Sequence, residues 1–583
     1  MRARLFAALL LIAGCHELDS SYHGSPGPGL APGITGSVDP AVLVTSPAPG
    51  TWLAGPDVPI SGRARVPGRT IVSIDVDGQA AVVSADGSFQ GVAHLLSPGL
   101  ATVSVHAVDS LGADWFRHVS YVRGPFQTGE VADALVVRLE PGALVPGCDL
   151  VNQELAAVDL DATLRGLGPL ALVSVGALVK IDLTFLKTTY ATPTATLAFG
   201  QGTLDVEAVF PQLSVTVLVD DRSGLIPLQV TAVLTAKSAR ASGQASLAIS
   251  PGAVTCAINS PVAVVDGLTI QAPGLAGFVA NLAKKQVEAL IVSELEKLLG
   301  TKVPGMIDKA LANATGAHPL ALGQGTIELA LRPVSFDLSP GGFALALAAE
   351  TSPLASGSVQ WPARGSVPAV LGPTTRQVRV AVSRDFLESA LVALWSAGSL
   401  DIDLALGGPG PGSSLPIDAS SLGKLVPELA GSVPPGTPLV ARVRPRCPPE
   451  LRVGSGVAPL VLAVGEVELE LLANEQGVLR SLLAVSVHGE VPVDVVATGG
   501  SLGVVPAPVR ASFLFSIVRQ PVRIDEERLA VRLSLLADAL LPRAFTALAS
   551  IPLPVLVGHS LVDPEVSVSQ PGFDHLVLGA SLR

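Results

Sequence analysis

The sequence predicts an α+β fold, in which a small all-β sandwich precedes an elongated module of long, curved antiparallel sheets wrapped on helices. Residues 41–124 alternate over short segments with closely spaced turn signals, whereas residues 125–583 alternate over long segments with few turns. Two amphipathic helical segments stand between these long strands. Because strands and helices do not alternate regularly, a doubly wound parallel sheet is not expected.

The chain is unusually rich in apolar residues for a protein that is exposed to water. Hydrophobic residues make up 49% of the 583 residues and charged residues only 15%. No stretch after residue 20 approaches the roughly 20 consecutive apolar residues of a membrane-spanning helix. The excess must lie in large cores or in internal cavities that a ligand fills, and composition does not separate the two. A net charge of −12 without a basic run disfavours nucleic acid and electrostatic capture of anionic head groups.

The N-terminus has the pattern of an export signal. Arg2 and Arg4 precede the short apolar run Leu5–Ala13, and the segment Ile12-Ala-Gly-Cys15 resembles a lipobox. Residues 1–14 would then be a lipoprotein signal peptide, with Cys15 as the acylated residue. The alternative is an ordinary signal peptide that contains a cysteine. The resemblance implies a lipid-anchored protein of the bacterial cell envelope. With His16 rather than Asp after the cysteine, the outer membrane is expected, on its periplasmic or surface face.

A tether and a sandwich follow. Residues 15–40 are rich in Gly, Pro and Ser, which predicts a flexible tether. Within residues 41–124, Asp77-Gly78 and Asp86-Gly87 are hairpin turn signals, because Asp and Gly tolerate positive φ. The strand Ala101–Gly112 completes a pattern that resembles the Ig-like modules of secreted bacterial proteins. A spacer is the expected role.

The first helical segment is Leu275–Leu299, which follows Pro273-Gly274 and is expected to end at Gly300. Its apolar positions recur near a 3.6-residue period at Leu275, Phe278, Val279, Leu282, Leu290, Ile291, Leu295 and Leu298.

The second helical segment begins after Ser383, a favourable N-cap residue, and is expected to end at Gly398. Its apolar face consists of Phe386, Leu387, Ala390, Leu391, Leu394 and Trp395. A third, weaker helix is predicted at Leu535–Leu548, although Pro542 interrupts it.

Together these elements resemble the BPI/LBP/CETP family of tubular lipid-binding proteins over about 450 residues. The stretches that carry the resemblance are Ala134–Gly142, Gly252–Ile270 with the helix after it, Val378–Leu404, Arg446–Gly456, Glu466–Leu471 and the helix at Leu540. The family implies two barrels in a boomerang, at residues 125–325 and 326–583, which share a central sheet. Each barrel would hold the acyl chains of a phospholipid between its helix and a concave sheet.

The resemblance also implies the site residues. The lipid-binding candidates are Leu275, Phe278, Val279, Leu282, Leu290, Ile291, Phe386, Leu387, Leu391, Leu394 and Trp395. Plain core packing is the alternative for each of them, because barrel cores and lipid pockets use the same residue types. The family's first-barrel disulfide would involve Cys256, but the usual partner in the long helix is missing, and Cys148 is the expected substitute. Cys447 is left over.

No catalytic or metal-binding pattern stands out. The segment Gly499–Gly503 fits the G-x-S-x-G motif, but Val504-Val-Pro after it cannot begin a helix, so a hairpin loop is expected instead of a nucleophile elbow. The sequence has neither HExxH nor CxxC. We therefore expect no cofactor, no metal and no enzymatic activity. The predicted function is a lipid-anchored lipid carrier, and the alternative is a structural or adhesive surface lipoprotein without a ligand.

Overall fold

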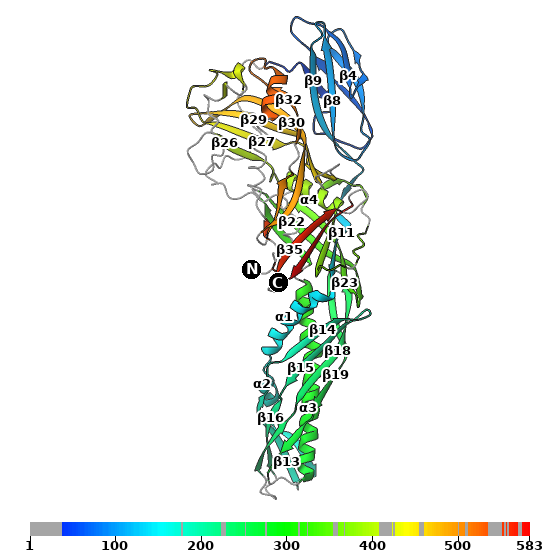
Figure 1. The fold of residues 1–583 in the computed structure, drawn as a ribbon, viewed down its shortest axis with the longest axis vertical. Coiled ribbons are helices and arrows are strands. Elements are labelled where there is room, and N and C mark those ends of the chain that lie inside the picture. The colour runs from blue at the N-terminus through cyan, green and yellow to red at the C-terminus, as the bar shows by residue number, and fades with distance from the viewer. Residues whose placement is uncertain are drawn as a thin grey trace.

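The computed structural model describes residues 38–582, with internal gaps. The gaps are 176–178, 223–228, 251, 274–276, 313–314, 323–324, 354–358, 366–367, 373, 407–421, 424–425, 454–459, 499–500, 508–510, 535–550, 553–554, 557–558 and 569–573. Cys15, Leu275 and the helix predicted at Leu535–Leu548 lie outside the described residues. The molecule is elongated, with one lobe at one end, a central sheet in the middle, and a second lobe beside a sandwich at the other end (Figure 1).

The sandwich consists of two sheets around one apolar core. The first sheet has the order β1 (Val42–Ser46), β3 (Asp57–Ala64), β7 (Ser88–His94), β6 (Val82–Val83). The second has the order β2 (Trp52–Leu53), β9 (Asp114–Arg123), β8 (Gly99–Asp109), β4 (Ile71–Val76), β5 (Gln79–Ala80). Asp77 and Gly78 have φ of 50° and 78° between the paired residues Val76 and Gln79, so the predicted hairpin turn is present.

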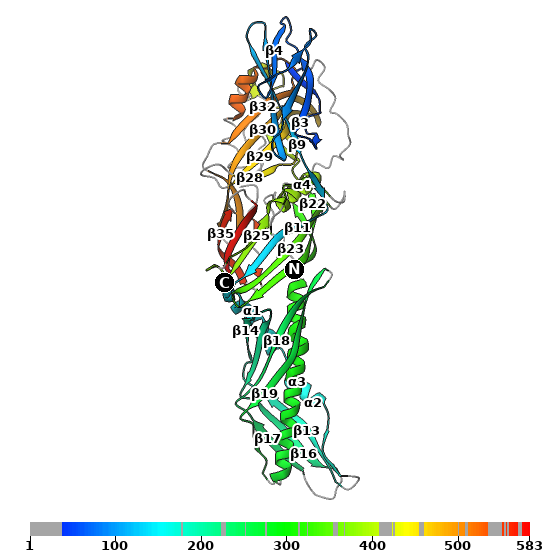
Figure 2. The ribbon, with the colours of Figure 1, turned by 90° about the vertical axis from the view of Figure 1, so that its right-hand side faces the viewer.

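The first lobe (residues 144–312) has two sheets and three helices. One sheet has the order β14 (Thr194–Phe199), β15 (Leu204–Pro211), β18 (Ser238–Ser250), β19 (Ala253–Asp266). The other has the order β12 (Leu170–Val175), β13 (Val179–Thr189), β16 (Ser214–Asp221), β17 (Gln229–Thr235), β20 (Thr269–Gln271). The helices are α1 (Leu144–Ala156), α2 (Leu160–Gly166) and α3 (Gly277–Ala312). Figure 2 shows α3 running along the lobe beside β18 and β19.

Helix α3 is longer than the sequence predicts. Gly300 was expected to end it, since Gly disfavours a helix interior by about 1 kcal/mol, and Pro304, which the helix also contains, disfavours it by about 3 kcal/mol. The helix nevertheless continues to Ala312, and Leu299 and Val303 are fully buried. A Cβ at position 300 would lie only 3.6 Å from Cγ of Pro261, so the helix backbone runs close to β19 there. Burial of the apolar face of α3 against the sheets of the lobe therefore offsets the local preference of Gly300 and Pro304 to end the helix.

The central sheet takes strands from distant parts of the chain. Its order is β21 (Gly316–Leu322), β22 (Gly325–Ser339), β23 (Gly342–Pro353), β11 (Glu130–Leu139), β25 (Val378–Ser383), β36 (His575–Leu582), β35 (His559–Val568), β34 (Val555–Leu556). A small pair, β10 (Phe126–Thr128) and β24 (Gln360–Pro362), lies apart from it, and the 3-10 helix η2 (Pro141–Ala143) follows β11. The boundary expected between residues 325 and 326 falls within β22, so it divides a strand of this sheet.

The second lobe (residues 402–534) is built on one long sheet. Its order is β26 (Ile402–Leu406), β27 (Leu439–Pro445), β29 (Leu460–Glu475), β30 (Val478–Thr498), β31 (Ser501–Pro506), β33 (Ile551–Pro552), with β28 (Glu450–Val453) paired to β29 and β32 (Ser512–Arg519) paired to β30. The 3-10 helix η3 (Pro427–Leu429) and a helical segment at 526–534 complete the lobe. Thr498 pairs with Ser501 in antiparallel strands, so the G-x-S-x-G segment is a hairpin, as predicted.

Helix α4 (Arg384–Ser396) has the predicted ends but not the predicted place. Ser383 accepts a hydrogen bond from the backbone N–H of Phe386 at 3.3 Å, and Gly398 follows with a φ of 70°. The helix packs on the central sheet rather than in the second lobe. It continues directly from β25, and at about 1.5 Å per residue it is only about 20 Å long. It therefore turns back onto the sheet that it leaves.

Candidate functional site

The interior of the first lobe is the part of the molecule that best matches the predicted apolar site. One side chain of α3 in every three or four points into this interior, as the helical period requires. The buried positions of this face are Val279, Ala283, Val287, Ile291, Leu295, Leu298, Leu299 and Val303.

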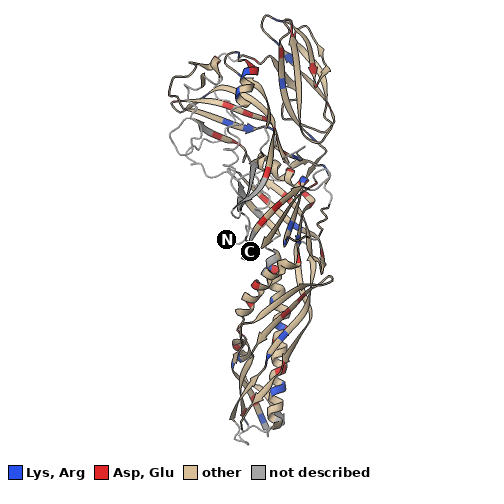
Figure 3. Ribbon diagram, viewed as in Figure 1, with Lys and Arg blue, Asp and Glu red and all other residues tan. Residues whose placement is uncertain are grey.

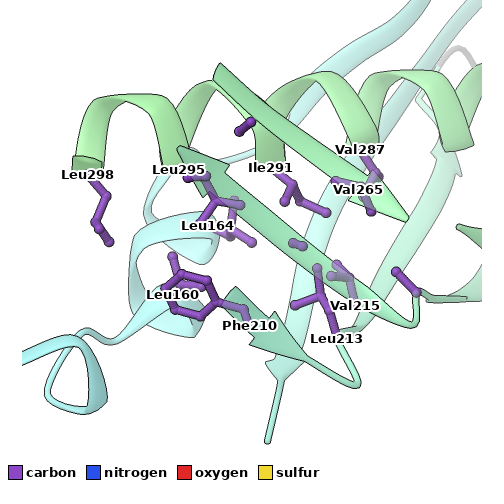
Figure 4. Packing of buried hydrophobic residues seen from close by; sticks show 14 of the residues in the cluster. Leu160, Leu164, Phe210, Leu213, Val215, Val265, Val287, Ile291, Leu295 and Leu298 are labelled. Atoms are coloured by element: carbon purple, nitrogen blue, oxygen red, sulfur yellow. The ribbon is translucent and has the colours of Figure 1, made fainter. Parts of the chain in front are cut away.

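The opposite walls come from α2 and from both sheets. Figure 4 shows Leu164 of α2 near Ile291 and Leu295 of α3, with Leu160 and Phe210 side by side farther from α3. Among the buried hydrophobic members of this cluster only Phe185 and Phe210 are aromatic. The interior is therefore a smooth aliphatic environment, closer in character to acyl chains than to planar or polar ligands.

Polar side chains fix α3 to the edge of its sheet. β19 is an edge strand, so its outward N–H groups need partners. Asp308 accepts a hydrogen bond from the N–H of Cys256 at 2.6 Å, and Glu296 accepts one from the N–H of Ala263 at 3.3 Å. α3 reaches the other sheet chiefly near β12 and β20. The helix is thus held to one wall of the lobe.

The structure distributes the candidates of the first helix unevenly. Val279 and Ile291 are buried in the interior, and Leu290 is half-buried at its margin. Phe278 lies in the helix, but its side chain is outside the described residues. Leu282 is 37% exposed, which corrects its prediction as an interior residue. Successive residues differ by about 100° around a helix, and the narrow contact face centres on Ala283, so Leu282 falls on the flank.

The candidates of the second helix do not line a second pocket. Phe386, Leu387 and Leu394 are buried in the core of the central sheet. Leu391 and Trp395 are partly buried against the same core. The Trp395 indole N–H donates to the carbonyl of Pro445 at 2.7 Å, and its ring stacks on Trp52 of the sandwich. These residues therefore pack where the central sheet, the sandwich and the second lobe meet, and not in the aliphatic core of the second lobe.

The second lobe has an aliphatic core of its own. The segment at 426–433 and the helix at 526–534 cover its sheet. The buried members are Leu406, Leu422, Val426, Leu429, Val433, Leu439, Ala441, Ala473, Leu482, Leu483, Val485, Ile517, Ile524 and Leu529. The sequence signal for this core was weak, because it comes from short segments without a sustained helical period.

The structure also corrects the expected Cys148–Cys256 disulfide. Cys148, Cys256 and Cys447 are all free thiols, and burial raises the pKa of Cys256 to about 11. The helix of Cys148 packs on β14, whereas Cys256 lies on β19, at the other edge of the four-stranded sheet. Three strand spacings of about 4.8 Å separate those edges. A disulfide needs Cα atoms within about 7 Å.

A buried polar junction between the sandwich and the second lobe was not foreseen from the sequence. Glu466 accepts hydrogen bonds from the backbone N–H of Ser120 at 3.0 Å and from the hydroxyl of Ser486 at 2.8 Å. Nδ1 of His488 lies 2.7 Å from the hydroxyl of Ser120. All four side chains are buried. The available signal was that Glu466 directly follows the apolar run 460–465 of β29, since buried carboxylates need partners.

A second buried group continues this junction toward the central sheet. Glu450 accepts the backbone N–H of Leu100 at 2.7 Å and also pairs with three arginines. Arg384 lies 3.0 Å away, Arg452 lies 2.9 Å away, and Arg364 makes the third contact. The side chain of Glu450 is 5% exposed. One carboxylate thus ties the sandwich, β28 and the start of α4 together, so the sandwich is not an independent spacer.

Other kinds of site are not evident in the described part of the chain. Within it, no cluster of three or more His, Cys, Asp or Glu side chains is placed to hold a metal ion. None of the described helices combines the length and the apolar character needed to cross a bilayer.

Comparisons with known proteins find distant similarity among solved structures. No family model matches the chain, and no curated protein matches it. Among solved structures, the fold is similar to the crystal structure of lipopolysaccharide binding protein, with 17% identity and a TM-score of 0.41 over 78% of this chain and 99% of that chain. A similarity of this size assigns neither a family nor a ligand to this chain.

Proposed function

We propose that this protein is a non-enzymatic lipid carrier that holds acyl chains in the interior of its first lobe. The observation that carries the proposal is the large, mainly aliphatic core between α3 and the two sheets. The buried stretch of α3 from Val279 to Val303 is about 37 Å long at 1.5 Å per residue. One leaflet of a bilayer core is about 15 Å thick, so a pair of acyl chains fits within that length.

The arrangement of the two sheets also supports a route by which acyl chains enter the first lobe. No ladder joins the two sheets among the described strands, and α3 is fixed mainly to β18 and β19. The sheets meet at a corner, where the N–H of Ala191 donates to the carbonyl of Pro211 at 2.9 Å and the N–H of Gln212 donates to that of Lys237 at 2.8 Å. We propose that they separate away from this corner. Each methylene that enters gains about 0.8 kcal/mol, less the cost of ordering the chain. We propose a second, equivalent site in the aliphatic core of the second lobe.

The test is a matched pair of variants on one helix. Ile291→Asn places an amide inside the lobe, whereas Leu282→Asn places it on the exposed flank. We expect purified wild-type protein and Leu282→Asn to carry diacyl lipid, seen by mass spectrometry of solvent extracts, and Ile291→Asn to have lost most of it. In an interior that holds lipid, water can replace the lost lipid beside the new amide, so the proposal predicts that the melting temperature of Ile291→Asn falls by only a few degrees.

Two outcomes would contradict the carrier function. If Ile291→Asn unfolds the lobe while the wild type holds no lipid, Ile291 is ordinary core. If wild-type protein neither contains lipid nor takes up fluorescent phosphatidylethanolamine from vesicles, the structural or adhesive alternative replaces the carrier.

We further propose that Cys15 anchors the protein to the outer membrane through a lipid. The N–H of Val38 donates to the carbonyl of Gln520 at 3.0 Å, so the chain before residue 38 leaves from the second lobe. The 23 residues from Cys15 to residue 37 reach at most about 80 Å. In a bacterial host that acylates lipoproteins, Cys15→Ser is expected to move the protein from the detergent phase to the aqueous phase. Unchanged partitioning would refute the anchor.

A further inference from the structure

A hollow of about 730 Å³ lies on the outer face of the sheet β14-β15-β18-β19. Asp205 and Glu207 line it, whereas the adjacent Leu204 belongs to the apolar core of the lobe interior. The hollow and the aliphatic interior thus occupy opposite faces of one sheet. Its volume lies within the range of small-molecule sites.

A bulge in the long β18–β19 hairpin shapes this hollow. The register shifts between Ser242 and Gln244, and Ser260 opposite has a φ of 48°. A Cβ at Gly243 would lie 2.6 Å from Cγ2 of Ile258, so only glycine fits at the bend. Bulges bend a strand and recur beside functional sites, and a serine held at positive φ costs free energy. The concavity is therefore a specified feature of the hairpin.

The lining combines hydrogen-bond donors with acceptors and holds several of them in place. The side-chain amide of Gln244 donates to Asp205 at 3.1 Å, and that of Asn259 donates to the hydroxyl of Ser246 at 3.1 Å. These contacts limit the rotamers of both amides, and each amide keeps an oxygen that can accept from a ligand.

The residue types of the lining narrow the ligand class. It contains no Lys, Arg, His or aromatic side chain, so it offers neither a charge for phosphate nor a surface for planar rings. Figure 3 shows lysines and arginines distributed along the molecule and not gathered on this sheet. Closely spaced hydroxyls, amides and carboxylates complement a ligand rich in hydroxyl groups. We propose that this hollow binds a neutral saccharide.

The proposal is tested on the full-length protein with two defined probes, chitotetraose and maltotetraose, by isothermal titration calorimetry. At least one is expected to bind the wild type. The double variant Gln244→Ala, Asn259→Ala should weaken that binding at least tenfold without a change in melting temperature. Thr194→Ala is the matched control, because Thr194 is exposed on the same face of β14 but lies outside the hollow.

The other outcomes overturn the proposal. They are binding of neither tetrasaccharide, equal binding by the double variant, or binding of spermidine in place of the saccharides, which would show a cation site at Asp205 and Glu207. The saccharide probes carry no acyl chain, so their failure to bind would not contradict the proposed lipid site. The lipid measurements test that site separately.

Discussion

Replacing Glu450 by alanine is expected to lower the free energy of unfolding by about 3–5 kcal/mol, the usual cost of removing one partner from a buried ion pair. Arg364, Arg384 and Arg452 converge on this carboxylate. Without it their charges lack their shared partner, although Arg364 and Arg384 keep Glu388. The N–H of Leu100 also loses its acceptor, which loosens the sandwich.

The measurement is the midpoint of urea unfolding, followed by tryptophan fluorescence, since Trp52 and Trp395 stack at the same junction. Glu490→Ala is the matched control. Glu490 also pairs with Arg452 but is 52% exposed, and exposed pairs contribute about 1 kcal/mol or less. Equal midpoints for the two variants would show that the buried cluster does not hold these parts together.

The second large effect concerns His488 and pH. The backbone N–H of Glu466 points at Nδ1 of His488 from 3.4 Å, and an N–H can only donate. Nδ1 is therefore an acceptor, and the neutral ring carries its proton on Nε2, which lies 3.1 Å from the hydroxyl of Ser486. Burial, followed by the charges of His118 and Arg117, lowers the pKa of His488 to about 3 from its ordinary 6.5.

The sign of the pH effect follows from this lowered pKa. Below pH 6.5 the unfolded chain protonates this histidine, whereas the folded chain does not until about pH 3. The folded state thus loses relative stability as the pH falls through that window, by about 3 kcal/mol at pH 4. His488→Gln lacks this loss, but at pH 7 it is less stable by about 1–3 kcal/mol because hydrogen bonds are missing.

The two stability curves should therefore converge as the pH falls from 7 and meet or cross by about pH 4, because the wild-type loss of about 3 kcal/mol equals or exceeds the deficit of the variant. Other groups at the junction act in the opposite direction, since burial raises the pKa of Glu466 and raises that of Glu526 to about 7. His118, Arg117, Glu466 and Glu526 are retained in both proteins, so their contributions largely cancel in the difference. Urea midpoints of both proteins at half-unit pH steps give the result. Parallel curves would mean that His488 does not titrate in this way.

Features fixed within a few residues could be predicted from the sequence. Ser383 and Gly398 set the ends of α4 through a side-chain cap and a positive φ. Asp77-Gly78 formed its hairpin, and residues 501–503 of the G-x-S-x-G segment lie in a strand that pairs with the strand before it. The hydrophobic period identified an apolar face on α3, and the buried residues Val279 and Ile291 lie on that face. Each of these depends on dihedral preferences or periodicity, which a local segment carries by itself.

Contacts between distant segments decided the rest. Packing against Pro261 and the lobe interior allows α3 to continue past Gly300. The apolar face of α4 is buried on the central sheet because α4 folds back onto that sheet. The junction pairs Ser120 with Glu466 and Leu100 with Glu450, across about 350 residues of chain. A sequence pattern shows that a strand contains a glutamate, but the partner that satisfies the charge is chosen only when the sheets pack. Burial, which sets the cost of that charge, exists only in the folded chain.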